Sequence, residues 1–170
     1  MIILGIDPGL QKTGWGIIFS EGHALQFKAC GLIKTNNADA LADRLAALHH
    51  GLSAVIDQWK PDTAAVEETF VNNNPASALK LGQARGVCLS VPAIMGIETA
   101  EYSANKIKKS LVGTGHAAKE QVGMMIRTLL PGALKNNGGQ IGADEADALA
   151  VAICHAHYGR TLKAYATPTR

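Results

Sequence analysis

Short apolar runs and longer helical repeats alternate along the chain. Runs that are rich in β-branched or apolar residues and bounded by turn residues predict strands at residues 2–6, 13–19, 24–33, 63–66 and 93–97. Apolar residues at helical spacing predict helices over residues 38–59, 75–90, 104–111, 117–130 and 144–157. The last of these helices is apolar on nearly every side beyond its first two turns, so most of it should be buried.

This order of elements predicts an α/β fold with one five-stranded mixed sheet flanked by helices on both faces. The first three strands should be antiparallel hairpin neighbours, and the later strands should enter through crossovers. Residues 1–157 are expected to form a single domain, because a chain of 170 residues with 47% hydrophobic side chains suits one compact core. Residues 158–170 are basic, contain Pro168 and are expected to form a loose tail.

The chain lacks the features of membrane and secreted proteins. No segment reaches the roughly 18–20 uncharged apolar residues of a membrane span, and the N-terminal MIILGID lacks the regions of a signal peptide. Cys30, Cys88 and Cys154 are odd in number, far apart and outside CxxC spacing. We interpret them as reduced thiols and expect a cytoplasmic protein with no membrane partner.

The charge of the chain is nearly balanced overall but uneven along the sequence. The formal net charge is +2, which says little about partners. In the segment from Tyr102 to Arg127, however, the single acid Glu120 is outnumbered by Lys106, Lys108, Lys109, Lys119 and Arg127. A locally basic surface on a nearly neutral protein favours a polyanion partner.

Four acidic residues stand out by their position. Asp7 and Glu67 each follow an apolar strand, although Glu68 is also a candidate at the second position. Asp144 and Asp147 are three residues apart and share one face of the last predicted helix. Taken singly, Asp7 could start a turn, Glu67 could be a solvated strand end, and Asp144 could cap its helix. Asp147 fits such an explanation least, because it lies past the cap.

Together, the four carboxylates predict a metal site. Carboxylates gathered on one face repel one another and any phosphate, and a hard divalent cation such as Mg²⁺ removes both conflicts. Two such ions about 4 Å apart can activate a water and stabilise the leaving oxygen in phosphodiester cleavage. Cys154, His155 and His157 do not make a convincing zinc site, since they lie on different helix faces and lack a partner pair.

Longer motifs carry a resemblance to a known family. The stretches are GIDPGLQKTGWG (5–16), VEETF (66–70), SALKLGQARGV (77–87), VGTGHAAKEQV (112–122) and ADEADALAVAICHAH (143–157). In content and order they resemble the RuvC family of crossover junction endonucleases, the Holliday-junction resolvases, which have a ribonuclease H-like fold. The resemblance spans essentially the whole chain, and its longest stretches are highly specific, whereas a lone DPG would not be.

The resemblance implies a metal-dependent DNA nuclease of recombination and repair. It makes Asp7, Glu67, Asp144 and Asp147 the catalytic, metal-binding set and selects Glu67 over Glu68. The implied cofactor is Mg²⁺, two ions per active site, with Mn²⁺ as a substitute. The implied reaction is symmetrical hydrolysis in two opposed strands of a four-way DNA junction by a homodimer, giving 5′-phosphate ends. The RuvA–RuvB branch-migration complex is the implied partner.

The same resemblance gives roles to residues around the acids. Lys108 and Lys119 match basic family positions near the scissile strand, and Lys106 and Lys109 are assigned to the same DNA-binding region; a solvated charged face is the alternative. Phe70 could stack on an unpaired base at the junction, but it fits the core equally well. The helix from residue 75 resembles the family's dimerisation helix, although its apolar face would also suit packing inside the protein.

Two backbone features complete the prediction. Gly9, Gly14 and Gly16 are expected to permit tight strand turns. The connector PGALKNNGGQIG (131–142) is longer than the usual family connector and could change how the last helix meets DNA.

Three other functions are weighed against the resolvase. Sugar-kinase and actin-like phosphate-binding proteins share the fold and an Asp-x-Gly turn, but they generally need two such domains to enclose a nucleotide. A small ribonuclease H-like nuclease that acts on RNA precursors is a second alternative, against which the SALKLGQARG and ADEADALA stretches speak. A non-catalytic junction-binding protein is the third, and the presence of all four acids gives it no support.

Overall fold

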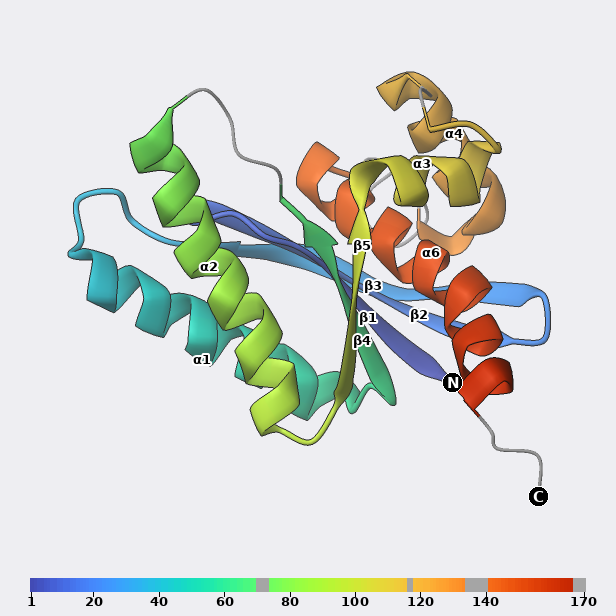
Figure 1. The fold of residues 1–170 in the computed structure, drawn as a ribbon, viewed down its shortest axis with the longest axis horizontal. Coiled ribbons are helices and arrows are strands. Elements are labelled where there is room, and N and C mark those ends of the chain that lie inside the picture. The colour runs from blue at the N-terminus through green and yellow to red at the C-terminus, as the bar shows by residue number, and fades with distance from the viewer. Residues whose placement is uncertain (70–73, 116–117, 134–140, 167–170) are drawn as a thin grey trace.

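A five-stranded mixed sheet lies between two groups of helices (Figure 1). Its strands, in spatial order, are β3 (Ala24–Lys34), β2 (Lys12–Glu21), β1 (Ile2–Asp7), β4 (Thr63–Glu68) and β5 (Glu98–Ser103). The first three strands along the chain are antiparallel neighbours, whereas β4 pairs in parallel with β1, and β5 with β4. The predicted strand number, directions and fold class are confirmed.

The structure is a computed structural model that describes residues 1–69, 74–115, 118–133 and 141–166, the last seven of these by their backbone only. On one face of the sheet lie α1 (Leu41–Trp59) and α2 (Pro75–Ile94), and on the other lie α3 (Ala104–Val112), α4 (Lys119–Leu129) and α6 (Ala143–Ala166). Side chains alternate between the faces of a strand, so Ile3 joins the core beneath α6 and Leu4 the core beneath α1 and α2. Within the described part of the chain, no helix is both long and apolar enough to span a membrane.

The helix α6 lies very close to the sheet, because glycines face it. A Cβ added to Gly5 would lie 2.1 Å from the carbonyl oxygen of Ala148, and one added to Gly14 would lie 2.1 Å from that of Asp144. No larger residue fits at either position without moving backbone. The prediction that Gly14 and Gly16 serve strand turns is wrong, since both lie inside β2 and give α6 room to approach.

The last strand was predicted in the wrong place. The apolar run 93–97 does not form a strand: α2 continues through it to Ile94, and the strand β5 follows at Glu98–Ser103. The sequence ETAEYS alternates between two environments, because Tyr102 enters the core beneath α6 while Glu101 pairs with Arg85 of α2. The two glutamates of this strand, Glu98 and Glu101, hid it from a search for apolar runs.

The last helix was predicted to end at residue 157, but α6 continues to Ala166. The segment 158–166 is rich in good helix formers, and its single interior glycine costs only about 1 kcal/mol. The first proline that would stop the helix is Pro168. The predicted loose tail therefore does not begin at 158, and its last part, 167–170, lies outside the described residues, as does 134–140 of the connector.

Candidate active site

Asp7 and Glu67 stand next to each other at the carboxyl ends of two parallel strands. The strands β1 and β4 are paired up to Ile6 and Val66, so Asp7 and Glu67 are the next residues on neighbouring strands. Each lies an even number of residues after strand positions in the core beneath α6, and both side chains therefore emerge on that face.

The helix α6 brings the other two predicted acids to the same edge of the sheet. Gly14 is the cross-strand partner of Asp7, and the backbone of Asp144, in the first turn of α6, rests on Gly14. Asp147 follows one turn later on the same helix face and lines a cavity with Glu67. Three elements that are distant in sequence thus contribute acids to one place.

These carboxylates interact electrostatically. Burial, followed by the negative charges of Glu67, Asp147 and Asp144, raises the pKa of Asp7 to about 8. Burial and the charge of Asp147 raise the pKa of Glu67 to about 7. Burial also raises the pKa of Asp147, although the positive charge of Lys119 opposes this effect. Acids in such a cluster hold protons near neutral pH unless a cation compensates their charge.

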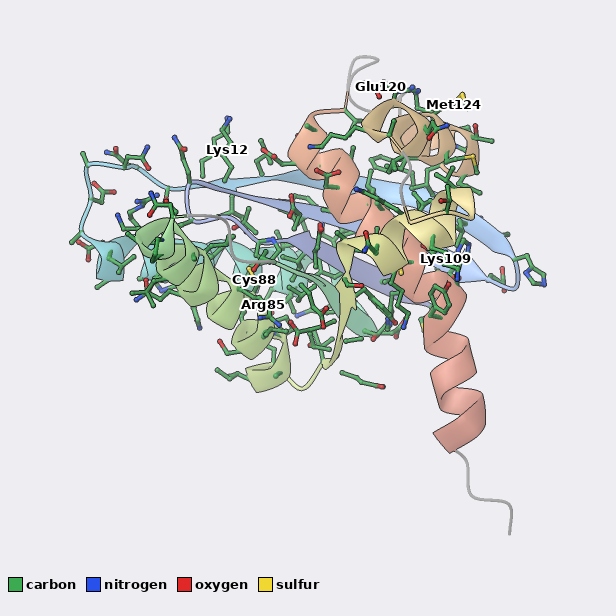
Figure 2. All side chains as sticks on the ribbon, turned by 45° about the horizontal axis from the view of Figure 1, so that its top comes forward. Lys12, Arg85, Cys88, Lys109, Glu120 and Met124 are labelled. Carbon is green, nitrogen blue, oxygen red and sulfur yellow. The ribbon has the colours of Figure 1, made fainter. Side chains whose placement is uncertain are left out.

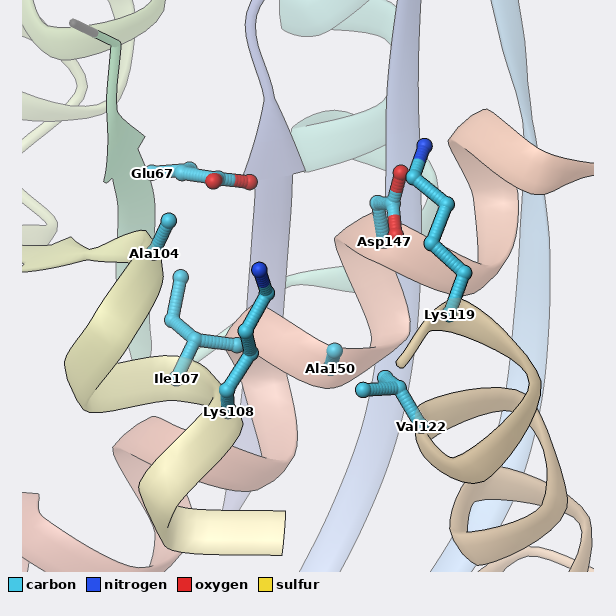
Figure 3. Close-up of a pocket in the computed structure, with 8 residues that line it drawn as sticks. All are labelled: Glu67, Ala104, Ile107, Lys108, Lys119, Val122, Asp147 and Ala150. Atoms are coloured by element: carbon cyan, nitrogen blue, oxygen red, sulfur yellow. The ribbon is translucent and has the colours of Figure 1, made fainter. Parts of the chain in front are cut away.

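Two lysines face these acids across a cavity of about 180 Å³ (Figure 3). Lys108 from α3 and Lys119 from α4 line it together with Glu67 and Asp147, and small or apolar side chains complete the wall: Ala104, Ile107, Val122 and Ala150. Both lysines lower the pKa of Glu67 and of Asp147. Positive charge therefore lies beside the acids, where a phosphate group would need it.

The donor set fits a hard divalent cation by its chemistry. All four acids offer carboxylate oxygens, the ligands that Mg²⁺ prefers, and their mutual repulsion is what a bound cation would relieve. Among the residues that the structure describes, however, no group of three or more His, Cys, Asp or Glu side chains is gathered closely enough to hold a metal ion. The acids border the site without converging on one point.

Lys106 and Lys109, predicted to bind DNA, lie on other sides of α3. The Nζ atom of Lys106 is 4.9 Å from the ring centroid of Tyr102 and 4.8 Å from that of Tyr158. Lys109 is exposed on the outer side of α3 (Figure 2). Neither lysine lines the cavity with the acids. Phe70 lies outside the described residues.

A buried hydrogen-bond chain behind the site was not found from the sequence. The Thr63 hydroxyl donates to the carbonyl oxygen of Glu98 at 2.9 Å, so it accepts from Nε2 of His155, which lies 3.0 Å away. The other ring nitrogen, Nδ1, then accepts from the Tyr102 hydroxyl at 2.8 Å. This chain ties β4, β5 and α6 together and gives His155 a structural role. Its members are 92 and 53 residues apart, so no local pattern indicates them.

A buried thiol also lies beneath the acids. Cys88 points from α2 toward the sheet (Figure 2), and burial, with a further contribution from the charge of Asp7, raises its pKa to about 12. A hydrogen bond with Thr13 opposes this shift. Cys88 is therefore a neutral thiol at physiological pH, and none of the three cysteines forms a disulfide, in line with the prediction of reduced thiols.

The fold and the site can be compared with known proteins. The structure of Thermus thermophilus RuvC in complex with a Holliday junction substrate matches this chain with a TM-score of 0.85 and 31% sequence identity, covering 95% of this chain and 96% of that one. The similarity confirms the predicted ribonuclease H-like fold.

Sequence comparison agrees with this match. A family model described as crossover junction endodeoxyribonuclease RuvC matches residues 3–155. A protein of the same name from Paramagnetospirillum magneticum is 60% identical over 161 residues, which cover 95% of this chain and 94% of the relative. One from Rhodospirillum rubrum is 56% identical over 158 residues, which cover 93% and 90%. The chain therefore belongs to the RuvC family of crossover junction endodeoxyribonucleases.

Proposed function

We propose that this protein resolves four-way DNA junctions by hydrolysing a phosphodiester bond in each of two opposed strands, leaving 5′-phosphate ends. The observation that carries the proposal is the cavity in which Glu67 and Asp147 face Lys108 and Lys119. Carboxylates suit a divalent cation and lysines suit a phosphate, and a nuclease needs both in one place. The relative solved with a Holliday junction substrate supports the same substrate for this chain.

The proposed metal ligands are Asp7, Glu67, Asp144 and Asp147. RuvC nucleases depend on metal, and for this chain we propose Mg²⁺, two ions per site, with Mn²⁺ able to replace it. Bound there, the metal would supply activation of the attacking water and charge compensation at the leaving oxygen. The chain contributes ligand position: two acids are fixed by paired strands, and two approach from the first turns of α6.

The proposed role of Lys108 and Lys119 is to hold the phosphate that is cut. Lys108 reaches the cavity from α3 and Lys119 from α4, so the two ammonium groups approach from different helices (Figure 3). This arrangement places positive charge on the side of the phosphate that the carboxylates leave open. Each phosphate contact should add about 0.9 to the salt dependence of DNA binding.

A homodimer follows from the need for two cuts. Each chain supplies one set of acids, and a twofold pair of chains would present two equivalent sites to two opposed strands. The helix α2 is our candidate interface, because it is an outer element and its Leu79 and Ile94 are 67% and 76% exposed. Joint action with a RuvA–RuvB branch-migration complex belongs to the same proposal.

The test is cleavage of an end-labelled synthetic four-way junction, beside a linear duplex and an RNA hairpin of matching sequence, with Mg²⁺ and with EDTA. We expect paired symmetrical nicks in the junction alone, and only with Mg²⁺. Binding without cutting in Mg²⁺ would support a non-catalytic junction-binding protein. Preferential cutting of the RNA hairpin would support the nuclease of RNA precursors.

A further inference from the structure

A second hollow continues from the active-site cavity along α4. Its volume is about 260 Å³, and Lys119 and Asp147 line both spaces. Its wall includes the buried Ile126 and the half-buried Ile141, and Arg127 lies on its border. Because the two spaces share residues, a DNA strand that lies in the active site can continue into the second hollow.

The side chain of Arg127 turns back along α4 toward Lys119. Its Nη1 atom lies 3.6 Å from the place that a Cβ on Gly123 would occupy, so the glycine leaves room for the guanidinium against the helix. Lys119, Gly123 and Arg127 are spaced four residues apart and form one row on the helix surface. Glu120 and Met124 lie on the outer side of α4 (Figure 2).

Arg127 makes no ion pair with any residue that the structure describes; the pairs found there are Lys60–Asp57 and Arg85–Glu101. The side chain is exposed. A guanidinium presents a planar fork of donors that matches a phosphate group with two parallel hydrogen bonds. A positive charge that pairs with none of the described residues, in a hollow that leads out of a nuclease site, suits the phosphates of a DNA backbone.

We propose that Arg127 binds a backbone phosphate of the strand being cut, close to the scissile phosphate, and that the apolar wall contacts the sugar-phosphate backbone between the two phosphates. The inference rests on the proposed function and extends its substrate contacts along α4. Lys119 and Arg127 are about 12 Å apart along the helix axis, and the turned-back arginine shortens that span. At an axial rise of about 3.4 Å per nucleotide, the bound phosphate lies roughly one to three nucleotides from the cut.

The test compares the wild type with Arg127→Gln in binding a fluorescent four-way junction in EDTA over a range of salt concentrations. Glutamine keeps the helix propensity of arginine and removes its charge. Loss of one phosphate contact should reduce the slope of log affinity against log salt by about 0.9, so the variant should bind roughly eightfold more weakly than the wild type at 0.1 M salt.

Two controls accompany this variant. Arg127→Lys keeps the charge and should retain the wild-type slope. Lys60→Gln removes one exposed positive charge just before the start of β4, whereas Glu67 lies near the other end of that strand. This control variant should leave the slope unchanged. A reduced slope in Lys60→Gln as well would mean that the effect reports overall charge, and this outcome overturns the inference.

Single neutral methylphosphonate linkages, placed at each of the three phosphates on either side of the cut, then locate the contact. One of them should weaken binding by the wild type about eightfold but binding by Arg127→Gln less than twofold, since the variant has already lost that contact. Equal penalties in both proteins, or an unchanged salt slope in Arg127→Gln, overturn the inference. The proposed function still stands in that case if the wild type cuts junctions. A wild type that neither binds nor cuts junctions refutes both.

Discussion

Gly14 and Asp144 meet backbone to backbone, so that a Cβ on Gly14 would lie 2.1 Å from the Asp144 carbonyl oxygen. Gly14 is also the cross-strand partner of Asp7. The start of α6 can approach the sheet this closely only because Gly14 has no Cβ atom. This close approach determines the distance between the acids of the sheet and those of α6. Gly5 makes a similar contact with Ala148 further along the helix.

Gly14→Ala should push the start of α6 away from the sheet. We expect a loss of about 1–3 kcal/mol in the free energy of unfolding, from overpacking. Cleavage should fall by roughly 100-fold, because a shift of about 1 Å in a catalytic group has an effect of that size. Chemical denaturation and single-turnover cleavage measure the two effects.

The matched control for Gly14→Ala is Ile17→Val, in the same strand but in the core beneath α1 and α2. It should lose about 0.5–1.5 kcal/mol of stability and cut at the wild-type rate. Normal cleavage by Gly14→Ala would show that the docking of α6 does not determine the geometry of the acids.

Asp7→Asn should lower the cleavage rate by about 1000-fold or more, while junction binding persists. In EDTA it should also be more stable than the wild type at pH 8. The raised pKa of Asp7, about 8, means that the folded wild type loses stability as the pH rises from about 4 to about 8. The variant lacks this loss, which we place at about 1–3 kcal/mol after solvent screening.

Thermal unfolding from pH 4 to pH 9 checks this prediction. The two proteins should be equally stable near pH 4 and should diverge as the pH rises. Addition of Mg²⁺ should then stabilise the wild type and not the variant, because only a protein that binds the ion gains from it. Junction cutting by Asp7→Asn at the wild-type rate would exclude Asp7 as a metal ligand.

Glu67→Gln and Glu68→Gln should differ sharply, although the residues are neighbours. Glu67 lines the cavity with Lys108 and Lys119, whereas Glu68, the next residue in the strand, emerges on the other face of β4. We expect Glu67→Gln to lose cleavage about as severely as Asp7→Asn and Glu68→Gln to remain within about threefold of the wild type. Parallel single-turnover assays decide between them, and the reverse order would reassign the ligand.

The affinity for Mg²⁺ should rise from about pH 6 to about pH 9. Without metal, Asp7 and Glu67 hold protons in this range, since their pKa values lie near 8 and 7, and each must lose its proton to bind the ion. Calorimetry in two buffers of different ionisation enthalpy should detect proton release at pH 7 that disappears above about pH 9. An affinity independent of pH would mean that neither acid binds the metal.

Lys106→Met should affect stability more than DNA binding. Its ammonium lies over the rings of Tyr102 and Tyr158, and loss of these contacts should cost about 1 kcal/mol, which Lys106→Arg should restore. Lys108→Met, in contrast, should lower the salt slope of junction binding by about 0.9. If Lys106→Met lowers that slope equally, Lys106 contacts DNA, as its place in the basic segment predicts.

The parts of the fold that could be predicted are those that local sequence determines. The run before Asp7 is uniformly apolar and ends in Pro-Gly, so strand and turn are both visible. The strand β5 was missed because polar and apolar side chains are mixed along it. Glu101 is accommodated in this strand by its ion pair with Arg85, which lies on another element. Likewise, no local signal shows that Gly14 serves a helix that begins at Ala143.

The candidate site divides in the same way. Asp144 and Asp147 can be placed on one helix face from their spacing alone, and the longer motifs name the family. The position of Lys106 could not be predicted, because one of the rings that hold it, Tyr158, lies far along the chain in α6. Lys106, Lys108 and Lys109 look alike in sequence, and only the direction of each side chain from α3 distinguishes them.

The order of elements along the chain has a consequence for protein synthesis. The strands that carry Asp7 and Glu67 leave the ribosome early, whereas Asp144 and Asp147 arrive with α6, after every strand of the sheet. An unfinished or prematurely ended copy thus carries only half of the proposed ligand set. Cleavage by the proposed ligand set therefore requires that α6 has been translated and has docked on the sheet.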